Sequence, residues 1–115
     1  GLATSPIFLD APPPVLPGRA VAVEMSRPEP NPARSTTRIH WAVPAAQTGA
    51  DLDLSVYDLA GRRLATLASG PAREGRFTLD WDLRAEEGGR VGSGIYFLRF
   101  RVGTTTTSRK LVVMP

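Results

Sequence analysis

The stretch DLDLSVYDLAGRRLATLA, residues 51–68, carries the clearest structural signal in the chain. Leu52, Leu54 and Val56 alternate with polar residues, which is the period of two expected for a strand with one buried face. The turn DLAG ends in Gly61, a residue that adopts a positive φ at little cost. Leucines recur in the sequence that follows the turn. The segment therefore predicts a β-hairpin.

Short segments of the same kind lie on both sides of this hairpin. They are AVAVEM at 20–25, TTRIHWAVP at 36–44, GRFTLDWD at 75–82, IYFLRFRV at 95–102 and TTTTSRKLVVM at 104–114. IYFLRFRV is apolar on both faces in its first half, which predicts a central strand covered on both sides. Turns rich in glycine and proline separate the segments. Together they predict an all-β fold, an immunoglobulin-like antiparallel β-sandwich of about seven strands.

The first eighteen residues, GLATSPIFLDAPPPVLPG, have a different composition. They contain five of the eleven prolines and no regular hydrophobic pattern. We therefore expect an extended, proline-rich N-terminal arm at 1–18 before a sandwich domain at 19–115. The apolar side chains of this arm are the candidate partner-binding residues: Ile7, Phe8, Leu9, Val15 and Leu16.

An ordered arm would need more than side-chain contacts to be stable. Fixing a backbone residue costs about 1–2 kcal/mol, whereas burying a large apolar side chain returns roughly 1.5–3 kcal/mol. Backbone hydrogen bonds to an open sheet edge would supply the rest, and SPIFLD at 5–10 has a suitable composition. The arm would reach roughly 55 Å when extended, and APPPVLPG at 11–18 is a stiff spacer. This favours strand addition to another copy of the chain over folding back.

Composition excludes several classes of protein. The 115 residues fit one domain with an appendage, and the absence of cysteine excludes a disulfide framework and a thiolate metal site. No stretch approaches the roughly eighteen apolar residues of a membrane-spanning helix. The net charge of +3 comes from dispersed arginines, not from a basic stripe with aromatics, so nucleic acid is not an expected partner. The chain begins at Gly1 without a leader, as expected for a processed chain or an excised segment.

Few residues could carry chemistry. His40 is the only histidine, and we expect it on the polar face of a strand. The four glycines at 88–94 are followed by neither a Lys-Ser/Thr pair nor a helical pattern, so they do not form a phosphate loop. Carboxylate pairs could bind calcium or act in acid–base catalysis, but the polar face of a strand predicts the same residues: Asp51 with Asp53, and Asp80 with Asp82. We predict no catalytic residue, metal ligand or cofactor, and therefore no enzyme.

Four blocks, in order along the chain, resemble those of a bacterial family. They are PNPARSTTRIHWAVP at 30–44, VYDLAGRRLATL at 56–67, WDLRAEEGGRVGSGIYFLRF at 81–100 and SRKLVVMP at 108–115. They are similar to PNPFNPSTTIRFDLP, VYDLxGRxVxxL, WDGRDxxGxxVxSGxYFYRL and TRKLVLLK of type IX secretion C-terminal sorting domains. The Ig-like domain of the flagellar hook-cap protein FlgD follows the same pattern.

The resemblance covers residues 30–115 and implies an Ig-like fold. It also implies a role in directing a larger protein to the cell exterior or surface through outer-membrane secretion machinery. Ala33 stands where the family usually has Phe, and Ser35 where it often has Pro. The arm has no counterpart in the family pattern.

Three functions are compatible with these features. The first is a non-enzymatic, extracellular structural module whose arm packs on a neighbouring subunit, as in a filament or surface appendage. The alternative is a sorting domain for secretion or surface attachment of a larger type IX cargo protein, with the arm as a linker. The third is a carbohydrate-binding accessory module that uses Trp41 and Trp81 as exposed platforms, although their alternation with polar residues favours core positions.

Overall fold

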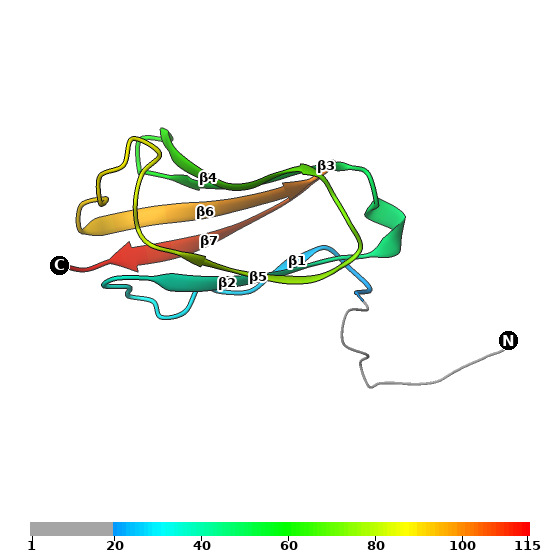
Figure 1. Ribbon diagram of the computed structural model, residues 1–115, viewed down its shortest axis with the longest axis horizontal. Helices are drawn as coiled ribbons and strands as arrows, with labels where there is room; N and C mark the ends of the chain where they lie inside the picture. Colours follow the sequence, from blue (N-terminus) through cyan, green and yellow to red (C-terminus); the bar gives the residue numbers. More distant parts are fainter. Residues whose placement is uncertain (1–19) are drawn as a thin grey trace, which may run out of the picture.

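Two antiparallel β-sheets face each other in the computed structural model, which describes residues 20–115 (Figure 1). One sheet has the strand order β1-β2-β5 and the other β4-β3-β6-β7. The strands are β1 (Glu24–Met25), β2 (Thr37–Val43), β3 (Asp51–Tyr57), β4 (Arg63–Pro71), β5 (Gly75–Trp81), β6 (Gly94–Val102) and β7 (Thr105–Val113). The prediction of an Ig-like sandwich of about seven strands is confirmed. The predicted contacts of the arm, Ile7, Phe8, Leu9, Val15 and Leu16, lie outside the described residues.

The chain crosses between the sheets three times. After β2 it passes through a 3₁₀ turn (Ala45–Gln47) into β3, and the hairpin β3–β4 follows. It returns to the first sheet as β5, which pairs with β2, and crosses again to form the hairpin β6–β7. This 3₁₀ turn is the only helix in the described part of the chain, and no helix there is long and apolar enough to cross a membrane.

The strand register gives each sheet one inward face. Leu54 pairs with Phe100 and Val56 with Leu98, and all four side chains are fully buried between the sheets. Trp41 and Trp81 are only 9% and 3% exposed, so both belong to the core and neither is a surface platform for sugars.

Burial is incomplete at the edges and on the outer faces of the sheets. Phe77 and Leu79 are half-buried, because β5 is the edge strand of the smaller sheet. On the outer face of β6, Ile95 is 39% and Phe97 36% exposed. The prediction that β6 is covered on both faces is therefore wrong for residues 20–115, since no second layer lies over the outer face of its sheet.

A candidate recognition end of the sandwich

Each of the four sequence blocks contributes a loop, a turn or a terminus to one end of the sandwich. Figure 1 shows there the loop at 26–36, the turn at 58–62, the loop at 82–93 and the C-terminus. The 3₁₀ turn and the point where the described chain begins lie at the opposite end (Figure 1). We call the first of these the C-terminal end. Antiparallel pairing produces this arrangement, because alternate connections between strands return to the same end.

Asn31 joins the first loop to the last strand. Its side-chain Nδ2 donates a hydrogen bond to the Lys110 carbonyl at 2.9 Å, and its Oδ1 accepts one from the Val112 amide at 2.9 Å. The Ala33 amide donates to the Val112 carbonyl at 2.8 Å, and the Met114 amide donates to the Ala33 carbonyl at 2.8 Å. The loop therefore pairs with the outer edge of β7 as a short strand would. It satisfies backbone groups that an edge strand otherwise leaves open.

Two arginines hold the last residues of the chain. The Arg90 guanidinium donates to the Met114 carbonyl at 2.9 Å and also to the Arg34 carbonyl. Arg34 in turn donates from Nη1 to the Pro115 carbonyl at 3.2 Å. Arg90 comes from the loop between β5 and β6, so three segments that are distant in sequence meet at the end of β7.

The loop at 82–93 is built around buried side chains. Trp81 Nε1 donates to the Arg84 carbonyl at 3.0 Å, and the Tyr96 hydroxyl donates to the Gly92 carbonyl at 2.6 Å. Leu83 is fully buried and has a φ of 62°, a left-handed conformation that side chains rarely adopt. The loop is thus a packed part of the sandwich.

Glu86 attaches the same loop to the edge of the larger sheet. Its amide donates to the Leu64 carbonyl at 2.9 Å, and its carboxylate accepts from the Thr66 amide at 3.2 Å. Both partners belong to β4, an edge strand whose outward backbone groups are occupied there.

The turn at 58–62 is organised by Asp58. Its Oδ1 accepts hydrogen bonds from the amides of Ala60 at 3.0 Å and Arg62 at 2.9 Å. The Arg62 amide, followed by the Ala60 amide and the Arg62 guanidinium, holds the pKa of the Asp58 carboxyl below its usual range. Gly61 has a φ of 85°, as the predicted turn requires. The carboxylate thus supports the turn of the β3–β4 hairpin.

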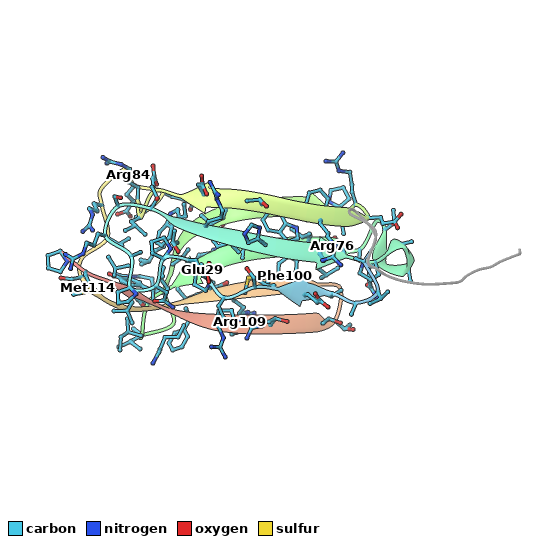
Figure 2. All side chains as sticks on the ribbon, turned by 90° about the horizontal axis from the view of Figure 1, so that it is seen from below. Glu29, Arg76, Arg84, Phe100, Arg109 and Met114 are labelled. Carbon is cyan, nitrogen blue, oxygen red and sulfur yellow. The ribbon has the colours of Figure 1, made fainter. Side chains whose placement is uncertain are left out.

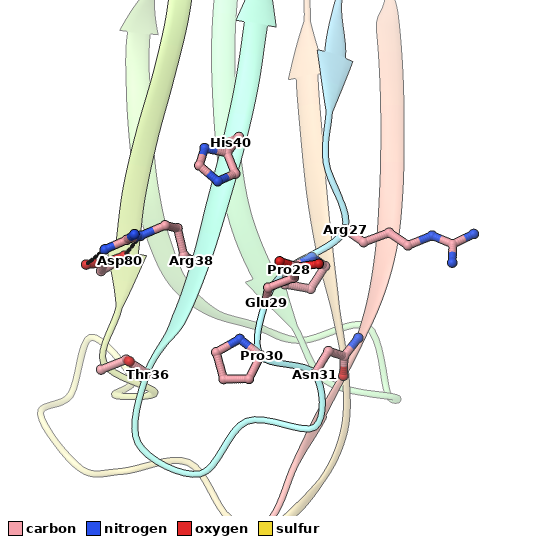
Figure 3. Close-up of a pocket in the computed structure, with 9 residues that line it drawn as sticks. All are labelled: Arg27, Pro28, Glu29, Pro30, Asn31, Thr36, Arg38, His40 and Asp80. Atoms are coloured by element: carbon pink, nitrogen blue, oxygen red, sulfur yellow. Dashed lines mark hydrogen bonds and ion pairs between the residues drawn. The ribbon is translucent and has the colours of Figure 1, made fainter.

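An open groove of about 870 Å³ lies on the outer side of the smaller sheet, next to the loop at 26–36 (Figure 3). Arg38 and Asp80 form a two-point ion pair there, with Nε to Oδ1 at 2.8 Å and Nη2 to Oδ2 at 3.2 Å. The hydrogen bond from Arg38 lowers the pKa of Asp80, and the bond to Asp80 raises the pKa of Arg38. His40 Nδ1 lies 2.8 Å from Thr78 Oγ1 on the exposed face, so its predicted place on a polar strand face is confirmed.

Three of the four predicted carboxylates lie within ion-pair distance of an arginine. Asp53 Oδ2 is 3.7 Å from Arg63 Nη1, and Asp82 Oδ2 is 3.9 Å from Arg84 Nε. Across residues 20–115, no cluster of three or more His, Cys, Asp or Glu side chains is placed to hold a metal ion. Asp53, Asp80 and Asp82 are therefore paired with neighbouring arginines, whereas no ion pair of Asp51 is found within residues 20–115.

A family model for the secretion system C-terminal sorting domain matches residues 30–114. The chain belongs to this family. The comparison with curated proteins found no match. Among solved structures, dimeric latent PorU from Porphyromonas gingivalis is similar, with a TM-score of 0.59 and 21% identity over 83% of this chain. PorZ, an essential bacterial surface component of the type-IX secretion system of the same organism, has a TM-score of 0.47 and 22% identity over 81% of this chain. The chain spans only about a tenth of either protein's length, 10% and 11%.

Membership of the sorting-domain family makes Leu83 an informative departure. The family pattern WDGRDxxG has glycine at this position, whereas this chain has leucine. The backbone nevertheless keeps the left-handed conformation that suits glycine. The leucine side chain is accommodated because it points into the core, where it is fully buried.

The roles of Asn31 and Arg90 in this sorting domain were not found from the sequence. The PNP motif predicts a loop, but it does not predict the two hydrogen bonds of its asparagine to β7. These bonds join residues that are 79 and 81 positions apart in the sequence. Arg90 lies in a glycine-rich loop whose length predicts no particular contact. The one available signal was that the blocks containing both residues are shared with the family.

Proposed function

We propose that this chain is a C-terminal sorting domain that directs the protein carrying it through the type IX secretion system to the cell surface or the exterior. The observation that carries the proposal is the family match over residues 30–114. The domain acts as a folded secretion signal that outer-membrane secretion machinery recognises. It performs no catalysis and requires no cofactor.

The arrangement of the C-terminal end supports this role. The residues that follow β7 are built into the fold. Met114 and Pro115 are held by Arg90 and Arg34, and the preceding residues pair with the loop at 26–36. Recognition of this end would therefore report that the whole domain is folded.

The assembly interpretation, with an arm that packs on a neighbouring copy, depends on residues 1–18, which lie outside the described part of the chain. The comparisons support the sorting interpretation instead, and they offer nothing for filament formation. The arm then serves as the linker between the cargo and the sorting domain. Its proline run suits a spacer that keeps two folded bodies apart.

A secretion assay tests the proposal. A periplasmic reporter is fused in front of residues 1–115 and expressed in a type IX-competent bacterium, and in a strain that lacks the outer-membrane machinery. We expect the reporter at the surface or in the medium in the first strain and in the periplasm in the second. The reporter without the domain provides the baseline. Equal export from both strains, or export without the domain, would contradict the proposal.

Removal of residues 108–115 should abolish this export. The segment contains Leu111 and Val113, which are fully buried or nearly so, and it supplies the backbone groups that bond to Asn31 and Ala33. Limited proteolysis of the truncated domain should show loss of the fold. A truncated chain that is protease-resistant and still exported would show that the end of β7 is dispensable.

A further inference from the structure

The outer face of the larger sheet carries an apolar patch at the C-terminal end of the sandwich. Register places Phe97 between Tyr57 on β3 and Lys110 on β7, and it places Ile95 beside Val112. Ile95 and Phe97 are 39% and 36% exposed, while Tyr57 and Val112 are half-buried. We call Tyr57, Ile95, Phe97 and Val112 the β6 patch. Its apolar strand pattern is typical of a buried strand, yet no second layer formed by residues 20–115 lies over it.

Cations border the patch on three strands. Arg63 on β4 pairs in register with Tyr57, and Lys110 on β7 pairs with Phe97. Arg99 follows along β6 and places its guanidinium 5.3 Å from the centre of the Tyr57 ring. An arginine stacked on an aromatic ring beside exposed apolar side chains is a composition enriched in protein interfaces.

Acidic side chains near the patch are already bonded: Asp58 follows Tyr57 in the turn and pairs with Arg62, and Glu86 bonds to the backbone of β4. Asp53 pairs in register with Arg101, toward the opposite end of the sheet from the β6 patch. Its carboxylate reaches back toward Arg63, with Nη1 to Oδ2 at 3.7 Å. Arg99 and Lys110 have no acidic side chain within ion-pair distance among residues 20–115. The patch is therefore apolar at its centre and positively charged at its border.

We infer that the β6 patch is the docking face for a protein partner whose surface is apolar at its centre and acidic at its border, a component of the outer-membrane secretion machinery. This rests on the proposed function and assigns the recognition to one face. The apolar centre would be buried on binding, and the cations would orient the partner and speed its association.

The charges argue against two other occupants. A second copy related by two-fold symmetry would bring the same arginines and lysine of both copies together, and like charges in an interface are unfavourable. Residues 1–19 contain one acid and one base, Asp10 and Arg19, so they cannot neutralise the border. The described chain also begins at the end of the sandwich opposite the patch (Figure 1).

The test measures binding of the labelled full chain to outer-membrane vesicles by co-sedimentation. One set of vesicles comes from a type IX-competent bacterium and the other from a strain that lacks the machinery. Phe97→Asp and Lys110→Glu alter the centre and the border of the patch. Their matched controls lie outside it: Val21→Asp changes an apolar side chain that is 92% exposed, and Arg76→Glu reverses an exposed cation on the other sheet. Figure 2 labels Arg76, which belongs to β5.

We expect the wild-type chain to bind only the vesicles that contain the machinery. Phe97→Asp should weaken this binding by about tenfold or more, as for a residue at the centre of an interface. Lys110→Glu should weaken it by about threefold or more through the reversed charge at the border, and each control by less than about twofold. Added salt should weaken wild-type binding and have less effect on Lys110→Glu. Thermal unfolding shows whether Phe97→Asp is folded, and Lys110→Glu tests the patch without altering an apolar contact.

The binding results distinguish failure of this inference from failure of the proposed function. Wild-type binding with unchanged binding of both folded patch variants overturns this inference and leaves the proposed function standing. Equal binding of the wild-type chain to both kinds of vesicle contradicts the proposed function, and the inference falls with it. A patch variant that abolishes self-association in sedimentation equilibrium assigns the face to a second copy. Tenfold tighter vesicle binding after deletion of residues 1–19 assigns it to the arm.

Discussion

Replacing Leu83 by alanine and by glycine should give two proteins of nearly equal stability, although glycine normally costs more than alanine in a folded backbone. Leu83 is fully buried and has a φ of 62°. A residue with a side chain pays about 1–2 kcal/mol in this left-handed conformation. Burial of the leucine side chain stabilises the fold by roughly 1.5–3 kcal/mol, which offsets that cost. Leu83→Ala should lose about 2–5 kcal/mol, because the cost remains when the side chain is removed.

The comparison with glycine isolates the backbone strain. Going from alanine to glycine at position 83 removes one more buried carbon, worth about 0.8 kcal/mol, and adds about 0.5–1 kcal/mol of unfolded-state entropy. It also relieves the strain of about 1–2 kcal/mol. These contributions nearly cancel. Ala42→Gly is the matched control, because Ala42 is 2% exposed in β2 and lies in regular strand backbone.

Urea unfolding followed by tryptophan fluorescence measures both pairs, since Trp41 and Trp81 are buried. We expect the two variants at position 83 to differ by less than about 0.5 kcal/mol and Ala42→Gly to lose roughly 1.5 kcal/mol. The difference between the two sites in the free-energy cost of replacing alanine by glycine measures the backbone strain at position 83. If glycine costs as much at position 83 as at position 42, the left-handed backbone carries no strain and the reasoning fails.

Three further outcomes are expected. Asn31→Ala should lose roughly 1–3 kcal/mol for its two hydrogen bonds to β7, whereas Ser35→Ala in the same loop should be neutral; equal urea midpoints would refute the strand-like role of Asn31. Trp81→Ala should lose about 3–5 kcal/mol, and a melting temperature within a few degrees of wild type would contradict its burial. The pKa of Asp58 is lower in the folded state than its unfolded value of 3.8, so the ionised carboxylate stabilises the fold at pH values above 3.8. This contribution is lost as the pH falls through the lower pKa of the folded state. Asp58→Ala should therefore narrow the stability difference between pH 6 and pH 3 in urea titrations, and an unchanged difference would exclude this contribution.

Local patterns were sufficient to predict most strands. The alternation in β2, β3 and β5 reports which side chains face a core, and the positive φ of Gly61 follows from the turn sequence. Prediction was weaker where burial depended on neighbours. Phe77 and Leu79 alternate as core residues do, yet an edge strand leaves both half-exposed. The pattern specifies the inward side of a strand, whereas its place in the sheet decides how completely that side is covered.

The sequence by itself determined the fold class, the family and the positions of the turns, because backbone preference and apolar periodicity are properties of neighbouring residues. The packed structure decided the rest. Asn31 reaches β7 only because the packing of the two sheets brings together residues that are 79 and 81 positions apart in the sequence. Ile95 and Phe97 look like core residues in the sequence, but both lie on the surface. The reason is that no layer formed by residues 20–115 covers the outer face of the larger sheet. Contacts between distant segments, and the presence or absence of a covering layer, depend on how the sheets pack, and no local pattern encodes either.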